Sequence, residues 1–188
     1  MAVNATQFVN TVGGVLRKGQ SEAASGIYND WILSLLPTAL DLLAMKIAAD
    51  PARRGLLTRK FIVPLFADGS GNFAAADSKA ILKAGLCYAQ CEDTAKQDGA
   101  GENVRLVFKP NWQDVAELNR YLDSQFPYFA VRNNTVVTRA SGGDPAVVGP
   151  LWIYAVYVPD FDTYEMPDEL AGEAVAEVLA LAAQVLTK

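Results

Sequence analysis

The cysteine pair is the group in this sequence whose chemistry is easiest to assess. Cys87 and Cys91 are the only thiols, and the chain contains no histidine. A zinc site takes four Cys or His ligands and a catalytic cysteine needs a neighbouring base, so neither use fits two thiols alone. In a strand, residues four apart share one face but lie about 13 Å apart, too far for a disulfide. We expect reduced cysteines that pack in the core, with a redox role as the alternative.

Two groups of carboxylates could bind a metal or act as an acid–base pair. Asp160, Asp162 and Glu165 lie close together in the chain, but calcium loops need more oxygen ligands and an internal glycine. Asp114 and Glu117 lie one helical turn apart, although helix carboxylates more often serve solubility than proton transfer. We therefore expect no bound metal and no acid–base catalysis from these groups.

Two serines lie in glycine-containing turns, where nucleophiles and phosphate-binding loops are often found. Ser70 lies in DGSGN and Ser141 in ASGGD. Neither segment has the G-x-S-x-G or the G-x-x-x-x-G-K-[ST] arrangement, and a chain without histidine has no imidazole to activate a hydroxyl. The sequence thus predicts that the protein is not an enzyme and holds no cofactor.

Length and composition predict one globular domain over residues 1–188. The chain is 51% hydrophobic and 20% charged, which is enough apolar material for a packed core. Its most apolar stretch is interrupted by Asp30, Asp41 and Lys46, so we expect no membrane span. The first residues, MAVNATQFVN, lack the basic and apolar regions of a signal peptide.

The charged residues are distributed unevenly along the chain. Residues 1–158 hold 15 basic and 14 acidic residues, whereas residues 159–188 hold seven acidic residues and Lys188. One short basic cluster is formed by Arg53, Arg54, Arg59 and Lys60, with Phe61 as its adjacent aromatic residue. Nucleic-acid binders usually show a basic excess and a basic stripe, so a sequence-reading DNA binder is not expected.

Apolar periodicity predicts helices at both ends of the chain. Residues 4–17 and 20–49 carry apolar side chains at spacings of three and four, and Pro37 should break or bend the second segment. A terminal helix over 167–187 begins with a proline and two acidic residues, which suit a helix N-terminus. Residues 1–50 thus form a helical N-terminal part.

Alternation with a period of two predicts a sheet-rich part over residues 56–159. The segments 56–66, 104–109, 128–139 and 151–158 alternate as strands, 80–89 forms a strand or a short helix, and 111–122 forms a short helix. Asn133-Asn134 divides 128–139 into a hairpin. The expected fold is α+β, with N-terminal helices, a mainly antiparallel sheet of four to six strands including a hairpin, and a C-terminal helix.

The terminal helix carries an acidic stripe beside an apolar one. Glu169, Glu173 and Glu177 follow at steps of four, and each such pair opposes helix formation by about 0.2–0.5 kcal/mol. The acidic stripe is either a solvated face or a surface that meets basic groups or lines a charged channel. The apolar stripe, expected to pack inward or against a neighbour, is Leu170, Ala174, Val178, Leu181 and Val185.

The order of these elements resembles a family of virion proteins. The segment RKGQSE (17–22) lies in the helical start, LWIYAVYVPDF (151–161) is a proline-flanked strand, and MPDELAGEAVAEVLALAAQVL (166–186) is an acidic helix. This pattern spans most of the chain and resembles the head-to-tail adaptor or neck ring proteins of tailed bacteriophages, especially the ring proteins of crAss-like and short-tailed phages.

The resemblance implies a structural protein that forms a homo-oligomeric ring, commonly of twelve copies, below the portal protein. Such a ring extends the DNA channel, lies close to packaged DNA without reading it, and docks tail or nozzle proteins. The implied location is the neck of the virion, after synthesis in the host cytoplasm. In such a ring, Glu169, Glu173 and Glu177 would face the channel or pair with the basic cluster of an adjacent subunit, namely Arg53, Arg54, Arg59 or Lys60.

Two other functions remain open from the sequence. A tail-terminator or tail-completion ring would be mainly β with one flanking helix, and the helical residues before position 50 count against it. A small-molecule-binding or enzymatic α+β domain is the other alternative, and the missing histidine and phosphate-loop motifs count against that function.

Overall fold

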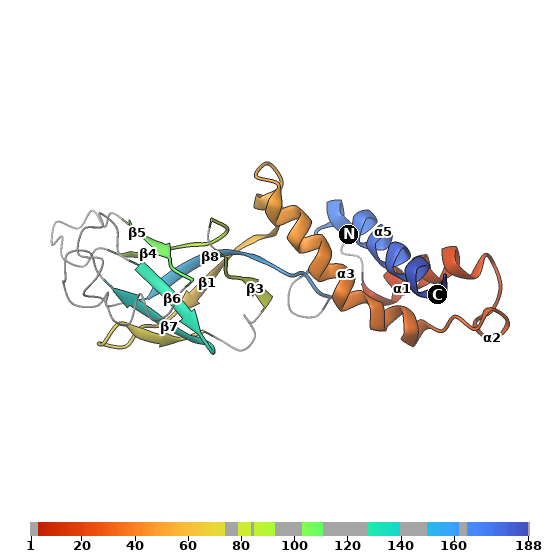
Figure 1. Ribbon diagram of the computed structural model, residues 1–188, viewed down its shortest axis with the longest axis horizontal. Helices are drawn as coiled ribbons and strands as arrows, with labels where there is room; N and C mark the ends of the chain where they lie inside the picture. The colour runs from red at the N-terminus through yellow and green to blue at the C-terminus, as the bar shows by residue number, and fades with distance from the viewer. Residues whose placement is uncertain are drawn as a thin grey trace. The chain divides into compact units, whose positions relative to one another are not determined.

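The computed structural model describes residues 4–73, 79–83, 85–92, 103–110, 128–139, 150–161 and 165–187. The chain divides into two compact units, where the sequence predicts one domain over 1–188. Met1–Leu57 and Val158–Lys188 form a helical unit, and Thr58–Tyr157 form a sheet unit. The division follows the order of the elements: both ends of the chain are helical and bury their apolar faces on one another, and the strands between them pair among themselves (Figure 1).

The helical unit contains α1 (Ala5–Arg17), α2 (Glu22–Ser25), α3 (Asn29–Ala49), the 3-10 helix η1 (Arg54–Leu57) and α5 (Asp168–Leu186). α1 begins with a capping box, in which Asn4 accepts a hydrogen bond from the Gln7 N–H and Gln7 accepts one from the Asn4 N–H. α1, α3 and α5 contact one another pairwise (Figure 1). The largest fully buried side chains of this unit are Phe8, Val12, Ile32, Leu43, Ile47, Leu57 and Leu170.

α3 is one continuous helix that contains Pro37, so the predicted break does not occur. Proline lacks the N–H that would bond to the carbonyl of Leu33. Pro37 and Leu33 are both exposed, so water can satisfy that carbonyl. The packing of Ile32 and Leu36 before the proline and Leu40 after it then keeps the helix on its partners.

α5 follows its predicted apolar stripe for three turns and then departs from it. Leu170, Ala174 and Val178 are fully buried, but Val185 is 51% exposed. In the next turn Ala182 is buried and Leu181 is half-buried, and residues 183–187 are all exposed, so the stripe loses its packing partners towards the end of the helix.

The sheet unit contains one mixed sheet with the order β1-β8-β4-β5-β6-β7-β2, and β3 pairs with β8. Its strands are β1 (Thr58–Val63), β2 (Ser70–Asn72), β3 (Ala80–Ile81), β4 (Tyr88–Glu92), β5 (Asn103–Phe108), β6 (Tyr128–Arg132), β7 (Thr135–Arg139) and β8 (Leu151–Tyr157). The strand pairs are antiparallel except for β5 and β6, which are parallel. The mainly antiparallel α+β fold is therefore confirmed.

The structure contains more strands than the four to six predicted, and the predicted hairpin is present. The described residues hold eight strands, because β2 and β3 are too short to show alternation. Asn133 and Asn134 connect β6 to β7 with φ values of 48° and 65°, the left-handed conformation that two-residue hairpin turns need. The short helix predicted over 111–122 lies outside the described residues.

The two faces of the sheet differ in burial. Leu151, Ile153 and Ala155 of β8 are fully buried, whereas Trp152 and Tyr154 between them are partly exposed. The buried face continues through Phe61, Ala89, Leu106 and Phe129 on the neighbouring strands. The opposite face of β1, β8, β4 and β5 therefore carries the side chains that can meet other molecules.

Candidate functional site

The predicted basic cluster is divided between the two units. Arg53 and Arg54 lie at the end of the helical unit's first segment, and Arg59 and Lys60 lie on β1 of the sheet unit. Each of the four contacts a carboxylate, a carbonyl or an aromatic ring of its own unit. The cluster is thus two separate pairs of cations with different partners.

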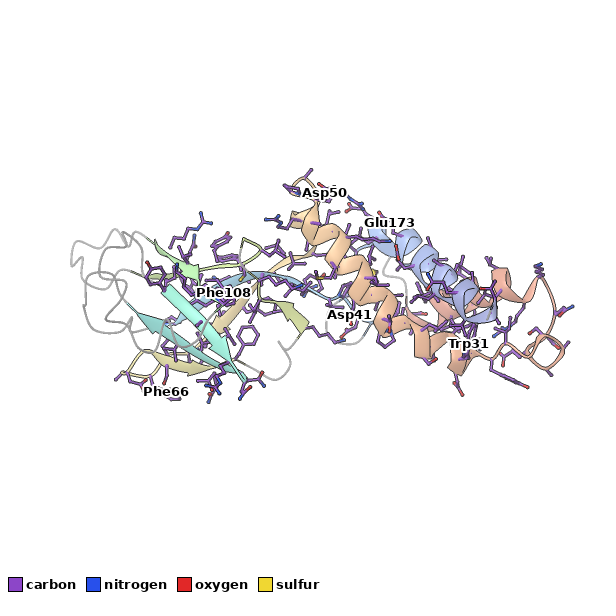
Figure 2. The ribbon with its side chains drawn as sticks, in the orientation of Figure 1. Trp31, Asp41, Asp50, Phe66, Phe108 and Glu173 are labelled. Carbon is purple, nitrogen blue, oxygen red and sulfur yellow. The ribbon has the colours of Figure 1, made fainter. Side chains whose placement is uncertain are left out.

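The acidic stripe of α5 meets cations of the same chain. Arg53 donates a hydrogen bond to Glu173, and Lys46 donates one to Glu177. The bond to Glu173 raises the pKa of the Arg53 guanidinium, and the nearby Asp50 acts in the same direction. Two cations therefore offset the repulsion between neighbouring glutamates on α5. Figure 2 labels Glu173 on this side of the helical unit.

The remaining members of the predicted set have distinct roles. Glu169 is exposed in the first turn of α5, where the helix dipole favours a negative charge. The Nε of Arg54 donates to the carbonyl of Ala48 over 3.1 Å, which satisfies one of the last carbonyls of α3. Whether Glu169, Glu173 or Glu177 faces a DNA channel stays a prediction.

The cations of β1 lie over aromatic rings of β8. Lys60 Nζ lies 4.0 Å from the ring centroid of Trp152, and the Arg59 guanidinium lies 4.4 Å from that of Tyr157. In the sequence only Phe61 lies beside this cluster, because the stacking partners come from a strand far along the chain. The antiparallel register joins them, since Lys60 opposes Tyr154 and Ile62 opposes Trp152.

Stacked side chains continue across the next two strands. The Tyr88 and Tyr154 rings are nearly parallel, with centroids 4.9 Å apart, and the Arg105 guanidinium lies 4.7 Å from the Tyr88 centroid. Tyr88 thus contacts a ring on one neighbouring strand and a cation on the other. We call the exposed side of these four strands the cation–aromatic face; it comprises Lys60, Ile62, Tyr88, Gln90, Arg105, Val107, Trp152 and Tyr154.

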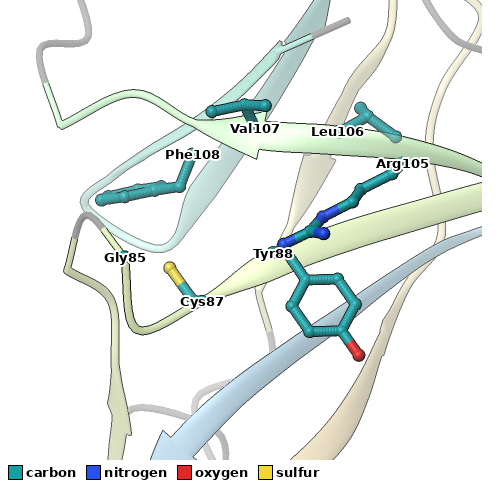
Figure 3. A pocket seen from close by; sticks show the side chains of 7 residues that line it. All are labelled: Gly85, Cys87, Tyr88, Arg105, Leu106, Val107 and Phe108. Atoms are coloured by element: carbon teal, nitrogen blue, oxygen red, sulfur yellow. The ribbon is translucent and has the colours of Figure 1, made fainter. Parts of the chain in front are cut away.

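A small pocket lies where β4 and β5 meet. It has a volume of about 230 Å³ and is lined by Gly85, Cys87, Tyr88, Arg105, Leu106, Val107 and Phe108. Figure 3 shows the Arg105 guanidinium beside the Tyr88 ring and the Cys87 thiol separate from both. The pocket offers an apolar wall and one cation, which suits a small side chain more than a cofactor.

The Cys87 thiol of this pocket is unreactive in character. It is 7% exposed, and its Sγ donates to the carbonyl of Lys83 over 3.4 Å. Desolvation raises the pKa of Cys87 to about 12, so the nucleophilic thiolate is scarce at neutral pH. Burial agrees with the expected packing role, and the side chain of Cys91 lies outside the described residues.

α3 exposes a second surface. We call it the α3 face; it comprises Asp30, Leu33, Ser34, Pro37, Thr38, Asp41, Leu42 and Met45. An 18-residue window of α3 has a mean hydropathy of 1.7, so the helix is long and apolar enough to cross a membrane by length and composition, a test that a core helix also passes. Leu33, Leu42 and Met45 are 40%, 42% and 38% exposed, and Asp41 is labelled in Figure 2.

The other candidates from the sequence gain no site from the described residues. Among those residues, no group of three His, Cys, Asp or Glu side chains could hold a metal ion. The Ser70 N–H and hydroxyl both donate to Asp68 within the turn before β2. Asp114, Glu117, Ser141 and Asp162 lie outside the described residues.

Two comparisons with known proteins identify no family for this chain. No protein-family model matches the chain, and a search of curated proteins finds no significant match.

Proposed function

We propose that this chain is a structural protein that assembles into a ring, as a head-to-tail connector of a tailed bacteriophage. The proposal retains the implied position of the ring in the neck of the virion, between the portal protein and the tail or nozzle proteins. The observation that carries it is the number of large apolar side chains that the helical unit exposes, three of them on the α3 face.

The helical unit leaves many large apolar side chains exposed. Eleven large hydrophobic side chains of the described residues are exposed, and eight of them belong to this unit. This concentration of exposed apolar side chains in one unit favours a contact with another protein or a membrane. The eight side chains are Val15, Tyr28, Leu33, Leu42, Met45, Leu56, Val185 and Leu186.

The energetics favour assembly through this surface. Leu33, Leu42 and Met45 are each about two-fifths exposed, so completing their burial contributes on the order of 1 kcal/mol per side chain. In a closed ring the same contact is repeated between every pair of neighbouring subunits. These contributions together stabilise the oligomer.

In this ring the acidic stripe forms the channel surface. A wall of carboxylates repels phosphates, which lets DNA slide, whereas lysine and arginine would hold it in a salt-dependent way. Glu173 is about half exposed even though Arg53 contacts it, and Glu169 is exposed. Replacing Glu169, Glu173 and Glu177 together with glutamine should leave assembly intact and slow DNA passage if they line the channel.

Native mass spectrometry of the purified chain, alone and mixed with a portal protein, tests the proposal. We expect a closed oligomer of uniform copy number, alone or on the portal. Replacing Leu42 and Met45 with lysine should abolish it, while Phe66→Lys, at an exposed position of the sheet unit, serves as the matched control. A chain that stays monomeric at all concentrations and does not bind the portal protein would disprove the proposal. Binding to tail proteins alone would indicate a tail-completion ring.

A further inference from the structure

The α3 face and the cation–aromatic face carry opposite charges on similar apolar surroundings. Asp30 and Asp41 are exposed on α3 among leucine, methionine and proline side chains and the hydroxyl groups of Ser34 and Thr38. Lys60 and Arg105 are exposed on the sheet beside Ile62 and Val107, which are 60% and 39% exposed. Each face therefore combines two like charges with apolar contact area, and the signs are complementary.

The spacing of the two charges is similar on both faces. Asp30 and Asp41 are separated by about three helical turns, so they share one side of α3 roughly 16 Å apart. Lys60 aligns through Tyr154 and Tyr88 with Val107, and Arg105 lies two residues further along that strand. Three strand spacings of about 4.8 Å and two residues of about 3.4 Å place their Cα atoms roughly 16 Å apart.

From this match we infer that the α3 face of one copy docks on the cation–aromatic face of another copy, with Asp30 and Asp41 against Lys60 and Arg105. The inference rests on the proposed ring function and names the contact that would build the ring. Because the two faces differ, the contact is heterologous, and repeated heterologous contacts close into a ring when the rotation permits.

A protein partner fits the α3 face better than a membrane does. Asp30 and Asp41 lie on its exposed side, so insertion of that side into hydrocarbon would bury two carboxylates. On a protein surface, the same carboxylates can remain at the rim and pair with cations there.

A protein partner also fits the sheet better than single-stranded nucleic acid does. Base-binding sheets offer open ring faces, but Tyr88 already contacts Tyr154 and Arg105, and Trp152 lies under Lys60. The sheet unit holds ten basic and ten acidic residues, without the basic excess that phosphate binding needs. Trp152 holds Lys60 in place and Tyr88 holds Arg105, which favours fixed contacts with carboxylates.

A charge-exchange experiment on the full chain tests the inference. One variant carries Asp30→Lys and Asp41→Lys, and the other carries Lys60→Glu and Arg105→Glu. We expect each variant alone to assemble at least tenfold more weakly than the parent in mass photometry. An equimolar mixture should recover assembly, because every contact in an alternating oligomer then joins opposite charges. Lys18→Glu with Arg132→Glu, at exposed positions outside both faces, changes the net charge as much as the Lys60/Arg105 variant does and is its control.

The outcomes separate this contact from the ring itself. If the parent forms rings and both variants form them equally well, the docking contact is wrong while the ring proposal stands. Charge-dependent assembly into dimers or open chains would support the contact and disprove the ring. Loss of binding to a fluorescent oligothymidine by the Lys60/Arg105 variant, with unchanged assembly, would assign the sheet to nucleic acid instead.

A second measurement covers the case in which charge reversal unfolds the chain, as judged by circular dichroism. The neutral variants Asp30→Asn with Asp41→Asn, and Lys60→Gln with Arg105→Gln, should each weaken assembly and flatten its dependence on salt. Unchanged salt dependence in both folded variants would overturn the inference.

Discussion

Lys60 on β1 lies over the ring of Trp152 on β8, with 4.0 Å between the ammonium nitrogen and the ring centroid. The two residues are not directly opposite, because Lys60 pairs with Tyr154 and Ile62 pairs with Trp152. The lysine therefore reaches diagonally along the exposed face, a distance that long side chains span readily between antiparallel strands. The contact keeps a cation and an indole together on a surface that water reaches.

A double-mutant cycle should detect this contact. Lys60→Met keeps most of the aliphatic stem and removes the charge, so we expect the free energy of unfolding to fall by about 0.5–1 kcal/mol. Trp152→Ala should cost more, because the indole also packs against the sheet. Urea unfolding of both single variants and the double variant gives the coupling energy. A coupling energy of zero would show that the lysine charge does not interact with the indole ring.

The ion pairs of α5 should make the stability of the helical unit depend on salt. Glu177 is paired with Lys46 and its side chain is only 16% exposed, whereas Glu173 is 45% exposed. We expect Glu177→Gln to lower the free energy of unfolding by up to about 1 kcal/mol, and Glu173→Gln to have a smaller effect. Thermal unfolding at low and at 1 M salt checks this, because salt should reduce the difference from the parent. An equal loss at both salt concentrations would point to packing.

Local patterns in the sequence were sufficient for most of the fold. Period-two alternation located β1, β5, β6, β7 and β8, and a helical period located α1, α3 and α5. The Asn133-Asn134 turn was predictable because a two-residue hairpin needs positive φ at both positions. Whether Pro37 breaks α3 or lies within one helix could not be decided from the sequence, since it depends on which side of the helix is exposed.

The candidate surfaces were less accessible to sequence reasoning, because they depend on which strands become neighbours. Lys60 lies far from Trp152 in the chain, and Arg105 lies far from Tyr154, so no window of sequence contains the cation–aromatic face. The alternation of LWIYAVY was the available signal: its partly exposed positions, Trp152 and Tyr154, are aromatic rather than polar. Pairing of Arg53 with Glu173 likewise required knowledge that α5 returns to α3.

Cys87 should resist modification in the folded protein. Its pKa of about 12 leaves little thiolate at pH 8. Iodoacetamide should therefore alkylate Cys87 only when the fold opens locally, and at a lower rate than it alkylates an exposed thiol. A Cys91→Ser variant isolates the Cys87 signal in mass spectrometry. Labelling of the native protein at the rate of the urea-unfolded protein would contradict this prediction.

The same thiol should weaken the fold at high pH. Its folded pKa lies above its ordinary value of 9.0, so the folded state holds the proton more tightly than the unfolded state. The contribution is therefore intact below pH 9 and is lost as the pH rises towards 12. Comparing the pH dependence of stability between the parent and Cys87→Ala isolates this effect from other titrating groups, and identical slopes above pH 9 would contradict it.

Two glycine-to-alanine substitutions should change stability in opposite directions. At Gly71 on β2, a Cβ atom would lie 2.5 Å from the carbonyl oxygen of Pro64, a backbone atom of the adjoining segment that bridges Leu65 to Gly71. At Gly172 in α5, a Cβ atom would meet nothing within 4 Å. The first position requires glycine because the backbones approach closely, and the second does not.

We expect Gly71→Ala to lower the free energy of unfolding by about 1–3 kcal/mol, because the backbone of β2 or of Pro64 must shift to admit the methyl group. Gly172→Ala should raise it by about 0.5–1 kcal/mol, because alanine loses less backbone entropy in a helix. Urea unfolding monitored by circular dichroism measures both, and each variant is the size-matched control for the other. If Gly71→Ala were as stable as the parent, the close approach of β2 to Pro64 would be wrong; a destabilised Gly172→Ala would mean that another surface, such as a second copy, contacts α5 at that position.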